Sequence, residues 1–338
     1  MEKKRIWFNT WFNTSYYFME LLRNNSDGYP FEIWCTNTNL NSIVFKMADH
    51  WELEPKIQGP EYVEYCLEFC KKNKIDVFIP RRGMNDISEQ IEAFMDNGTR
   101  VLLCHDPILL KTLNDKHLFY QAVKHMDIVQ IPEYRMVETA AEFRKAYEYL
   151  TAKGHRVCFK PQSGEGGSGF RIVESASVGI NTLLGPLSVR VPYDEALRIL
   201  DTVDRFESLM VLEYLDGLEY SIDCLADSDG NLRCAIPRQK TDGRIRELVK
   251  KPELIRIAER IAETYKIPYI YNVQVRYSQN IPKLLEINPR MSGGLHITCM
   301  SGVNYPYLAV RMLLGDCPDI PEPDFDVSIC QIEHAVKI

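Results

Sequence analysis

The sequence lacks the marks of several protein classes. Its 10 cysteines form no CxxC pair, the spacing typical of zinc ribbons and thioredoxin-like redox sites. No apolar run is long enough for a signal peptide or a membrane helix, which predicts a cytoplasmic protein with no membrane partner. Positive charge is not in excess, because the formal net charge is -7, and this argues against a nucleic-acid partner.

What is present fits a folded protein of more than one unit. A chain of 338 residues is too long for a single small core and predicts two or three units that share interfaces. The cysteines are scattered, and several lie in apolar runs, so we expect reduced, buried thiols. Cys66 and Cys70, four residues apart, would share one face of a helix. A nucleophilic cysteine stays open as an alternative, but no position is singled out.

The first part of the chain, residues 1–105, alternates between two hydrophobic patterns. Short apolar runs typical of strands occupy 5–8, 31–35, 75–80 and 100–104. Between them, helical spacing of apolar residues predicts helices at 15–23, 41–50, 62–74 and 86–96. Strands that alternate with helices in this way predict an α/β domain with an open parallel sheet.

The rest of the chain is richer in strands. Helices are predicted at 107–126, with Asp115 and Lys116 in the middle, and at 139–153, 194–205 and 252–265. Strands are predicted at 157–160, 170–173, 209–214, 220–226, 232–237, 272–277 and 282–287. Residues 175–193 carry turn signals without a period, which indicates an irregular insertion. This half is expected to be α+β rather than doubly wound.

A glycine-dense stretch, SGEGGSG at 163–169, matches the pattern G-x-G-x-x-G. A Rossmann loop would run from a strand into a helix, whereas this stretch joins two predicted strands. A Walker loop needs Lys-Ser or Lys-Thr after the last glycine, and a protein kinase needs HRD and DFG downstream; neither feature occurs. What remains is a hairpin whose bare amides can approach phosphate oxygens, with an ordinary glycine turn as the alternative.

Four separated motifs, in order between about residues 107 and 315, resemble those of the ATP-grasp superfamily, in the style of carbamoyl-phosphate-synthase-like carboxylate–amine ligases. They are Asn114-Asp115-Lys116-His117-Leu118-Phe119, Phe159-Lys160-Pro161 with the glycine loop, 212–223, and Asn272-Val273-Gln274 with 285–290. The resemblance implies an α/β N-terminal domain with an open parallel sheet at 1–105, followed at 106–338 by an α+β ATP-grasp fold of two subdomains. These would be a lid at about 131–212 and a metal and substrate subdomain at about 213–338.

The same resemblance implies a set of ATP-binding residues. Lys116 and Lys160 would neutralise phosphate charge, with solvated surface lysines as the alternative. In the hinge, Glu213 would meet the adenine amino group and Glu219 the ribose hydroxyls, and surface acids beside a turn are the alternative. The remaining contacts would come from the loop and from hinge main-chain groups, at Ser163, Gly164, Gly166, Gly167, Ser168, Tyr214 and Leu215.

Gln274, Glu286 and Asn288 would be the metal ligands. Glu286 and Asn288 are two apart on a predicted strand and so face one way, and Gln274 could reach them from the neighbouring strand. Carboxylate and amide oxygens suit Mg²⁺, here two ions, and Mn²⁺ could take their place. Many relatives have an acid where Gln274 stands. Polar residues lining a sheet edge are the alternative.

Three arginines are the candidate catalytic residues. Arg290 shares the face of Asn288 and could hold the γ-phosphate or a substrate carboxylate. Arg238 and Arg244 lie in a basic segment that faces phosphates or acceptor substrate in similar ligases, with a solvated hairpin as the alternative. His296, in a loop resembling a substrate-side loop, is a weaker candidate for a ligand or base.

The function implied is an ATP-dependent ligation. A small-molecule carboxylate would attack the γ-phosphate of ATP to give ADP and an acylphosphate, and an amine would then displace phosphate to form an amide. An ATP-grasp kinase that phosphorylates a small molecule and a non-catalytic ATP-binding module are the two alternatives. A homodimer stays open.

Overall fold

The computed structural model describes residues 2–124, 126, 128–162, 167–175, 184, 188–241, 243–332, 335 and 337. The chain forms two compact units. Unit 1 contains residues 1–114, 218–274 and 286–338, and unit 2 contains 115–217 and 275–285. Each unit combines segments that are distant in the sequence, so the units do not test the predicted domain boundaries. Those boundaries stay predictions.

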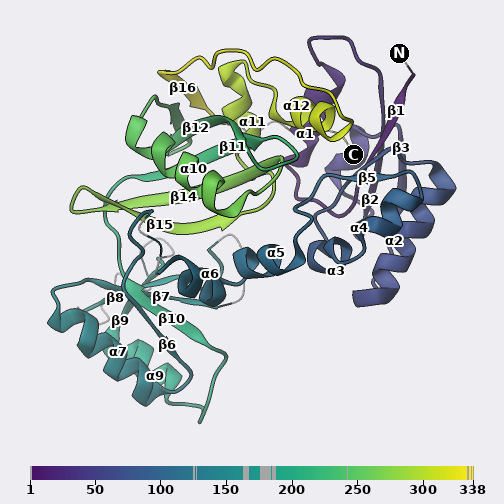
Figure 1. Cartoon of the computed structure of the whole chain (residues 1–338). Helices are drawn as coiled ribbons and strands as arrows, with labels where there is room; N and C mark the ends of the chain where they lie inside the picture. Colours follow the sequence, from purple (N-terminus) through teal and green to yellow (C-terminus); the bar gives the residue numbers. More distant parts are fainter. Residues whose placement is uncertain are drawn as a thin grey trace. The chain divides into compact units, whose positions relative to one another are not determined.

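The N-terminal part of unit 1 contains the predicted open parallel sheet. Its strand order is β3-β2-β1-β4-β5, and all neighbouring strands pair in parallel. Along β1, Trp7 packs with the helices that follow β3 and β4, whereas Ile6 and Phe8 face the opposite core. The elements, which Figure 1 shows in chain order, are β1(Lys4–Phe8), α1(Ser15–Arg23), β2(Phe31–Asn37), η1(Ile43–Lys46), β3(His50–Leu53), α2(Gly59–Asn73), β4(Val77–Ile79), α3(Met84–Ser88), α4(Ile91–Asp96) and β5(Arg100–Val101).

Two of the predicted helices in this part were wrong in detail. Residues 41–50 form only the short 3-10 helix η1. The edge strand β3 follows it and was not predicted, and its apolar residues Trp51 and Leu53 are exposed. The helix predicted at 86–96 is interrupted between α3 and α4. Cys66 and Cys70 are both buried on α2, as the four-residue spacing predicted.

A second sheet has the strand order β15-β14-β11-β12-β13-β16. Its residues belong to unit 1 except those at 275–285, which are assigned to unit 2. Helix α10 packs against β11 and β12. Apolar residues of this part, among them Tyr305 and Leu308, join the core of Ile6 and Phe8. Its elements are β11(Glu219–Ala226), β12(Leu232–Lys240), β13(Ile245–Leu248), α10(Pro252–Tyr265), β14(Ile270–Ser278), β15(Ile281–Asn288), α11(Leu295–Thr298), η2(Cys299–Ser301), α12(Tyr305–Leu313) and β16(Val327–Cys330).

Unit 2 is built on a five-stranded sheet with strand order β6-β10-β7-β8-β9. Helices α7 and α9 cover one face of this sheet (Figure 1). Phe143, Val211 and Ala196 belong to a small core of this unit. Strands β7 and β8 pair antiparallel, so the glycine-dense stretch joins two strands of a hairpin, as predicted. The elements are α6(Lys116–Val123), β6(Tyr134–Val137), α7(Ala140–Ala152), β7(Val157–Pro161), β8(Arg171–Glu174), β9(Arg190–Pro192), α9(Tyr193–Leu200) and β10(Leu209–Glu213).

The helix predicted at 107–126 is in fact two helices, α5(Pro107–Asn114) and α6. Asp115 stands between them in an extended conformation, and its side chain accepts hydrogen bonds from the backbone amides of His117 and Leu118. Asp115 is therefore the N-cap of α6 rather than a mid-helix residue. In the described part of the chain, no helix combines the length and apolar character that a bilayer span requires.

Candidate functional site

The end of β15 and the residues after it bring three predicted site residues of unit 1 together. The amide nitrogen of Asn288 donates to Oε1 of Glu286 over 2.8 Å, and Nη2 of Arg290 donates to Oδ1 of Asn288 over 3.3 Å. All three side chains are half-buried. The alternation of a strand puts Glu286 and Asn288 on one face, so a carboxylate and an amide oxygen lie side by side next to a guanidinium.

Gln274 lies on β14, which neighbours β15 in the sheet, and its side chain is half-buried. The two strands are joined at Gln279 and Asn280, whose φ values of 51° and 64° are typical of a tight two-residue hairpin turn. Gln274, Glu286 and Asn288 offer only carboxylate and amide oxygens, which is the donor chemistry that Mg²⁺ prefers. That these three residues bind two Mg²⁺ ions stays a prediction.

Charged residues continue along neighbouring strands of the same sheet. Glu219 pairs in register with Lys240, and Lys240 with Arg246, so the three side chains share one face. The ammonium of Lys240 lies 3.7 Å from the Glu219 carboxylate. Burial and the nearby charge of Arg238 lower the pKa of the Arg246 guanidinium. Arg244 lies beyond β12 near the start of β13 and is exposed.

Arg238 was predicted to face solvent or substrate, but its side chain is buried. Its side chain is only 8% exposed and forms an ion pair with Asp223, with Nη2 3.3 Å from Oδ2. His296 is half-buried, and its ring stacks on Tyr17 with 4.4 Å between ring centroids. Burial, assisted by the charge of Arg238, lowers the pKa of His296 to about 4, so the imidazole is neutral at neutral pH.

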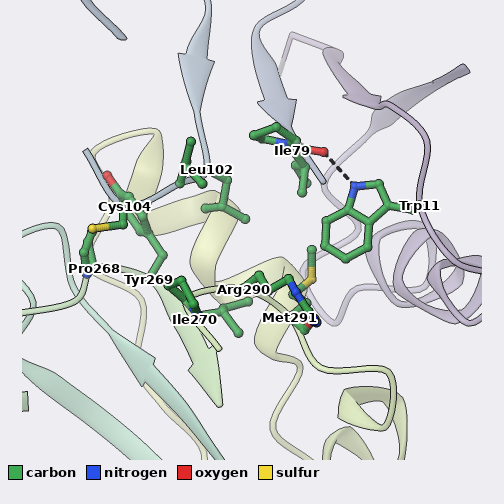
Figure 2. Close-up of a pocket in the computed structure, with 12 residues that line it drawn as sticks. Trp11, Ile79, Leu102, Cys104, Pro268, Tyr269, Ile270, Arg290 and Met291 are labelled. Atoms are coloured by element: carbon green, nitrogen blue, oxygen red, sulfur yellow. Dashed lines mark hydrogen bonds between the residues drawn. The ribbon is translucent and has the colours of Figure 1, made fainter. Parts of the chain in front are cut away.

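A pocket lies beside Arg290 in unit 1. Figure 2 shows Arg290 and Met291 near Trp11, whose ring nitrogen donates to the carbonyl of Ile79 over 2.9 Å. The wall comes from the carboxyl ends of β1, β4 and β5 and from the start of β14. Among the described lining residues Arg290 is the only charged one; the others are Trp11, Ile79, Pro80, Leu102, Leu103, Cys104, Pro268, Tyr269, Ile270, Pro289 and Met291.

The carboxyl edge of the parallel sheet is closed by a buried acid, Glu54, which follows β3. Its carboxylate accepts hydrogen bonds from the Thr10 amide at 3.0 Å, the Thr36 hydroxyl at 2.9 Å and the Tyr62 hydroxyl at 2.8 Å. Arg82, after β4, forms an ion pair with the same carboxylate at 2.7 Å. Glu54 therefore ties together the loops where an open α/β sheet usually binds a ligand.

In unit 2, the first predicted phosphate-binding lysine lies at the foot of the glycine hairpin. The ammonium of Lys116 donates to the carbonyl of Gln162 over 3.3 Å, and Gln162 in turn contacts the Asp115 carboxylate. Lys160 is half-buried on β7, with its ammonium 5.9 Å from the centre of the Tyr120 ring. Gly167 and Ser168 are exposed, whereas Ser163, Gly164 and Gly166 lie outside the described residues.

The predicted hinge contains a buried ion pair. Glu213 is 3% exposed, and its carboxylate accepts hydrogen bonds from the Lys283 ammonium and from the Glu133 amide. The Tyr214 amide donates to the Arg156 carbonyl over 2.7 Å, so this amide already has a partner within the chain. Leu215 is buried.

Three comparisons with known proteins agree with this architecture. A family model described as "ATP-grasp in the biosynthetic pathway with Ter operon" matches residues 205–335. The arginine-specific large chain of carbamoyl phosphate synthase from Geobacillus stearothermophilus is 23% identical over 309 residues, or 86% of this chain and 26% of that protein. The ADP complex of an N5-carboxyaminoimidazole ribonucleotide synthetase matches 96% of this chain and 80% of its own, with a TM-score of 0.68 and 12% identity.

The chain has the fold of ATP-grasp enzymes, and its residues 205–335 match an ATP-grasp family model. A further structure with this fold is the biotin carboxylase domain of Hydrogenobacter thermophilus 2-oxoglutarate carboxylase, in complex with Mg-ADP, ADP and bicarbonate. It matches 96% of this chain and 73% of its own at a TM-score of 0.66 and 14% identity. The chain spans about a quarter of the length of the curated relatives it matches, 26% for the Geobacillus protein.

The cysteines of this chain form no disulfide among the described residues, and of these cysteines only Cys317 and Cys330 are exposed. Burial raises the pKa of Cys104 to about 11 and that of Cys158 to about 12, which keeps both thiols protonated and poorly nucleophilic. The expectation that most cysteines are buried is confirmed, and their reduced state stays a prediction.

Several residues that shape the candidate site were missed from the sequence. Lys283 is part of no motif, and the tertiary fold, which includes an isolated bridge between Gln130 and Lys283, brings it to Glu213. Asp223 is the last residue of the motif at 212–223, and the motif assigned it no role. In the structure it is fully buried beside Arg238. An ionisable residue within an otherwise apolar strand, as in SIDCLA, was the one available signal.

Proposed function

We propose that this ATP-grasp protein uses Mg-ATP to activate a small-molecule carboxylate and join it to an amine. In the first step a carboxylate oxygen attacks the γ-phosphorus, and the bond from that phosphorus to the β,γ-bridging oxygen breaks, giving ADP and an acylphosphate. In the second step the amine attacks the acyl carbon and loses a proton, and phosphate leaves with one carboxylate oxygen.

The observation that carries this proposal is the row Glu286, Asn288 and Arg290, linked by hydrogen bonds of 2.8 and 3.3 Å. The oxygen donors of Gln274, Glu286 and Asn288 suit Mg²⁺, and we propose that these three residues hold two Mg²⁺ ions. Mn²⁺ could take their place. A divalent ion there would offset charge on the phosphoryl group in transfer. Arg290 would hold a phosphate or the substrate carboxylate as a two-pronged donor.

ATP itself is proposed to use the residues of the predicted nucleotide site. Lys116 and Lys160 would offset phosphate charge, the amides of Gly167 and Ser168 would approach phosphate oxygens, and Glu219 would accept from the ribose. Glu213 is held by Lys283 and by a backbone amide, which supports a fixed acceptor for the adenine amino group. The relatives in complex with ADP support this choice of nucleotide.

The partners proposed are a carboxylate and an amine, with no nucleic acid and no membrane; homodimerisation is proposed because one matched structure is described as a domain dimer. Free thiols persist in a reducing compartment, which supports a cytoplasmic location.

The test is a screen of paired carboxylates and amines for Mg-dependent ADP release, with mass spectrometry of each product. We expect ADP and an amide with at least one pair, and Glu286→Ala to abolish the signal. Glu259→Ala, an exposed acid on α10, is the matched control and should retain it. A phosphorylated product without an amide would identify a kinase instead, and binding of Mg-ATP without turnover on any pair would contradict ligation.

A further inference from the structure

A single buried carboxylate, that of Asp223 on β11, collects four side-chain donors in unit 1. Its Oδ1 accepts from the amide of Asn272 and from the hydroxyl of Ser292, both over 2.8 Å. Its Oδ2 accepts from the hydroxyl of Thr298 over 2.6 Å and from Nη2 of Arg238 over 3.3 Å. Asp223 is 0% exposed, so these four groups replace water entirely.

The register of the sheet explains why Asp223 and Arg238 meet. Asp223 pairs with Ile236 on β12, and Arg238 is two residues further on, so its side chain leaves the same face. A buried ion without a partner is strongly unfavourable, and neither charge is tolerated here without the other. The pair is thus a built feature of the fold rather than a surface contact.

Nε and Nη2 of Arg238 both donate hydrogen bonds inside the protein. Besides Asp223, its Nε donates to the Thr298 hydroxyl over 3.1 Å and Nη2 to the Ser292 hydroxyl over 3.4 Å. A Cβ added to Gly294 would lie 2.6 Å from the guanidinium carbon, so the guanidinium fills the space beside this glycine. Arg238 therefore holds the segment 292–298 at three of its residues.

That segment directly follows Arg290 and carries His296. Ser292 is two residues beyond Arg290, and Thr298 ends helix α11. His296 lies between these two anchors and stacks on Tyr17 of α1. Arg290 is two residues from the anchor Ser292, and His296 is two residues from the anchor Thr298. A displacement of these anchors would therefore displace Arg290 and His296 as well.

We propose that Asp223 is a positioning residue, which acts through Arg238, Ser292 and Thr298 to fix residues 290–298 beside the candidate site. Arg238 is then the second positioning residue, and its charge balances that of Asp223 instead of meeting a phosphate or a substrate carboxylate. The positioning claim stands on its own, whereas its kinetic consequence rests on the proposed function.

The first test measures backbone amide exchange by mass spectrometry and needs no substrate. In Asp223→Asn, exchange in a peptide covering 291–301 is expected to accelerate about tenfold or more, while the peptides of α2 and α7 keep their wild-type rates. Gly294→Ala, which displaces the guanidinium, is the second variant and should show the same local acceleration. Lys72→Gln, which breaks an exposed ion pair with Glu52, is the matched control and should change nothing in 291–301.

The second test separates positioning from ligand contact with Arg238→Gln and the double variant Asp223→Asn/Arg238→Gln. Positioning predicts that Mg-ADP affinity, measured by calorimetry, stays within about twofold in Arg238→Gln, and that turnover rather than KM falls for the pair found in the screen. The double variant removes both buried charges and is expected to recover about half or more of the lost turnover.

Two results would overturn the proposal. Wild-type exchange rates in 291–301 for both Asp223→Asn and Gly294→Ala would show that the network does not hold this segment. A loss of Mg-ADP affinity of about tenfold in Arg238→Gln, not recovered in the double variant, would show that Arg238 binds the nucleotide directly. A screen without any turnover would count against the proposed function alone, because the exchange and calorimetric results are obtained without a substrate pair.

Discussion

The side-chain amide of Asn288 donates a hydrogen bond to Oε1 of Glu286, two residues earlier on the same strand, over 2.8 Å. This contact fixes the rotation of both side chains and leaves Oδ1 of Asn288 turned to Arg290, 3.3 Å away. An oxygen-rich pair that is oriented before any ion arrives binds that ion with less loss of side-chain entropy.

Asn288→Ala is expected to raise the Mg²⁺ concentration needed for half-maximal ADP release by about tenfold, because one oxygen ligand and the support of Glu286 are both lost. A Mg²⁺ titration of ADP release at saturating ATP measures this. Asn41→Ala, an exposed amide in unit 1, is the control and should titrate like the wild type. An unchanged Mg²⁺ requirement in Asn288→Ala would remove Asn288 from the metal site.

Lys283→Met is expected to lower the free energy of unfolding by about 3 kcal/mol, because the buried carboxylate of Glu213 would lose its cation. The side chain of Glu213 is 2% exposed and cannot turn to water instead. Urea unfolding followed by fluorescence measures the loss. Lys283→Met/Glu213→Gln should regain most of it, and equal instability of the single and double variants would show that packing, not charge, is what Lys283 supplies.

Asp115→Ala is expected to lower stability by about 1 kcal/mol, because the first turn of α6 loses the acceptor for two backbone amides. Asp115→Ser retains a capping oxygen and should lose less. Helix α6 begins with Lys116, so the alanine variant should also weaken Mg-ADP binding in calorimetry, whereas unaltered binding would separate the cap from the nucleotide site.

The neutral imidazole of His296 predicts a pH dependence of stability. Its pKa is about 4 in the folded protein and 6.5 in its ordinary state, so the unfolded chain binds the proton first as the pH falls. The stability that the neutral ring contributes is therefore complete above pH 6.5 and lost progressively between 6.5 and about 4. In His296→Phe, which can still stack on Tyr17, the urea midpoint should fall less between pH 7 and pH 5 than in the wild type. His105→Gln, at an exposed histidine, is the control; equal slopes in His296→Phe and wild type would place a normal pKa at His296.

Much of the fold could be predicted because its elements have clear periods and ends. Helix α10 runs from Pro252 to Tyr265 as predicted, since one apolar stripe and an initial proline define it. Helix α12 was missed because it is apolar nearly all round and has no polar face to give a period. Strand β13 was missed because Arg246 and Glu247 hide the alternation of a short strand.

The candidate site was predictable where its residues share one motif and not where they meet through the sheet. Glu286, Asn288 and Arg290 are two apart in sequence, so their common face follows from strand geometry alone. The burial of Arg238 depends on the register between β11 and β12, which brings Asp223 to it across 15 residues. No local pattern carries that register, and a basic segment therefore looked solvated or substrate-facing.

The central claim, activation of a carboxylate as an acylphosphate, is tested most directly by the fate of a carboxylate oxygen. The carboxylate found in the screen is labelled with ¹⁸O in both oxygens. The ¹⁸O content of the phosphate released during amide formation is then measured by mass spectrometry. The account predicts one ¹⁸O in each phosphate and ADP as the nucleotide product. Unlabelled phosphate, or label recovered in AMP, would contradict it.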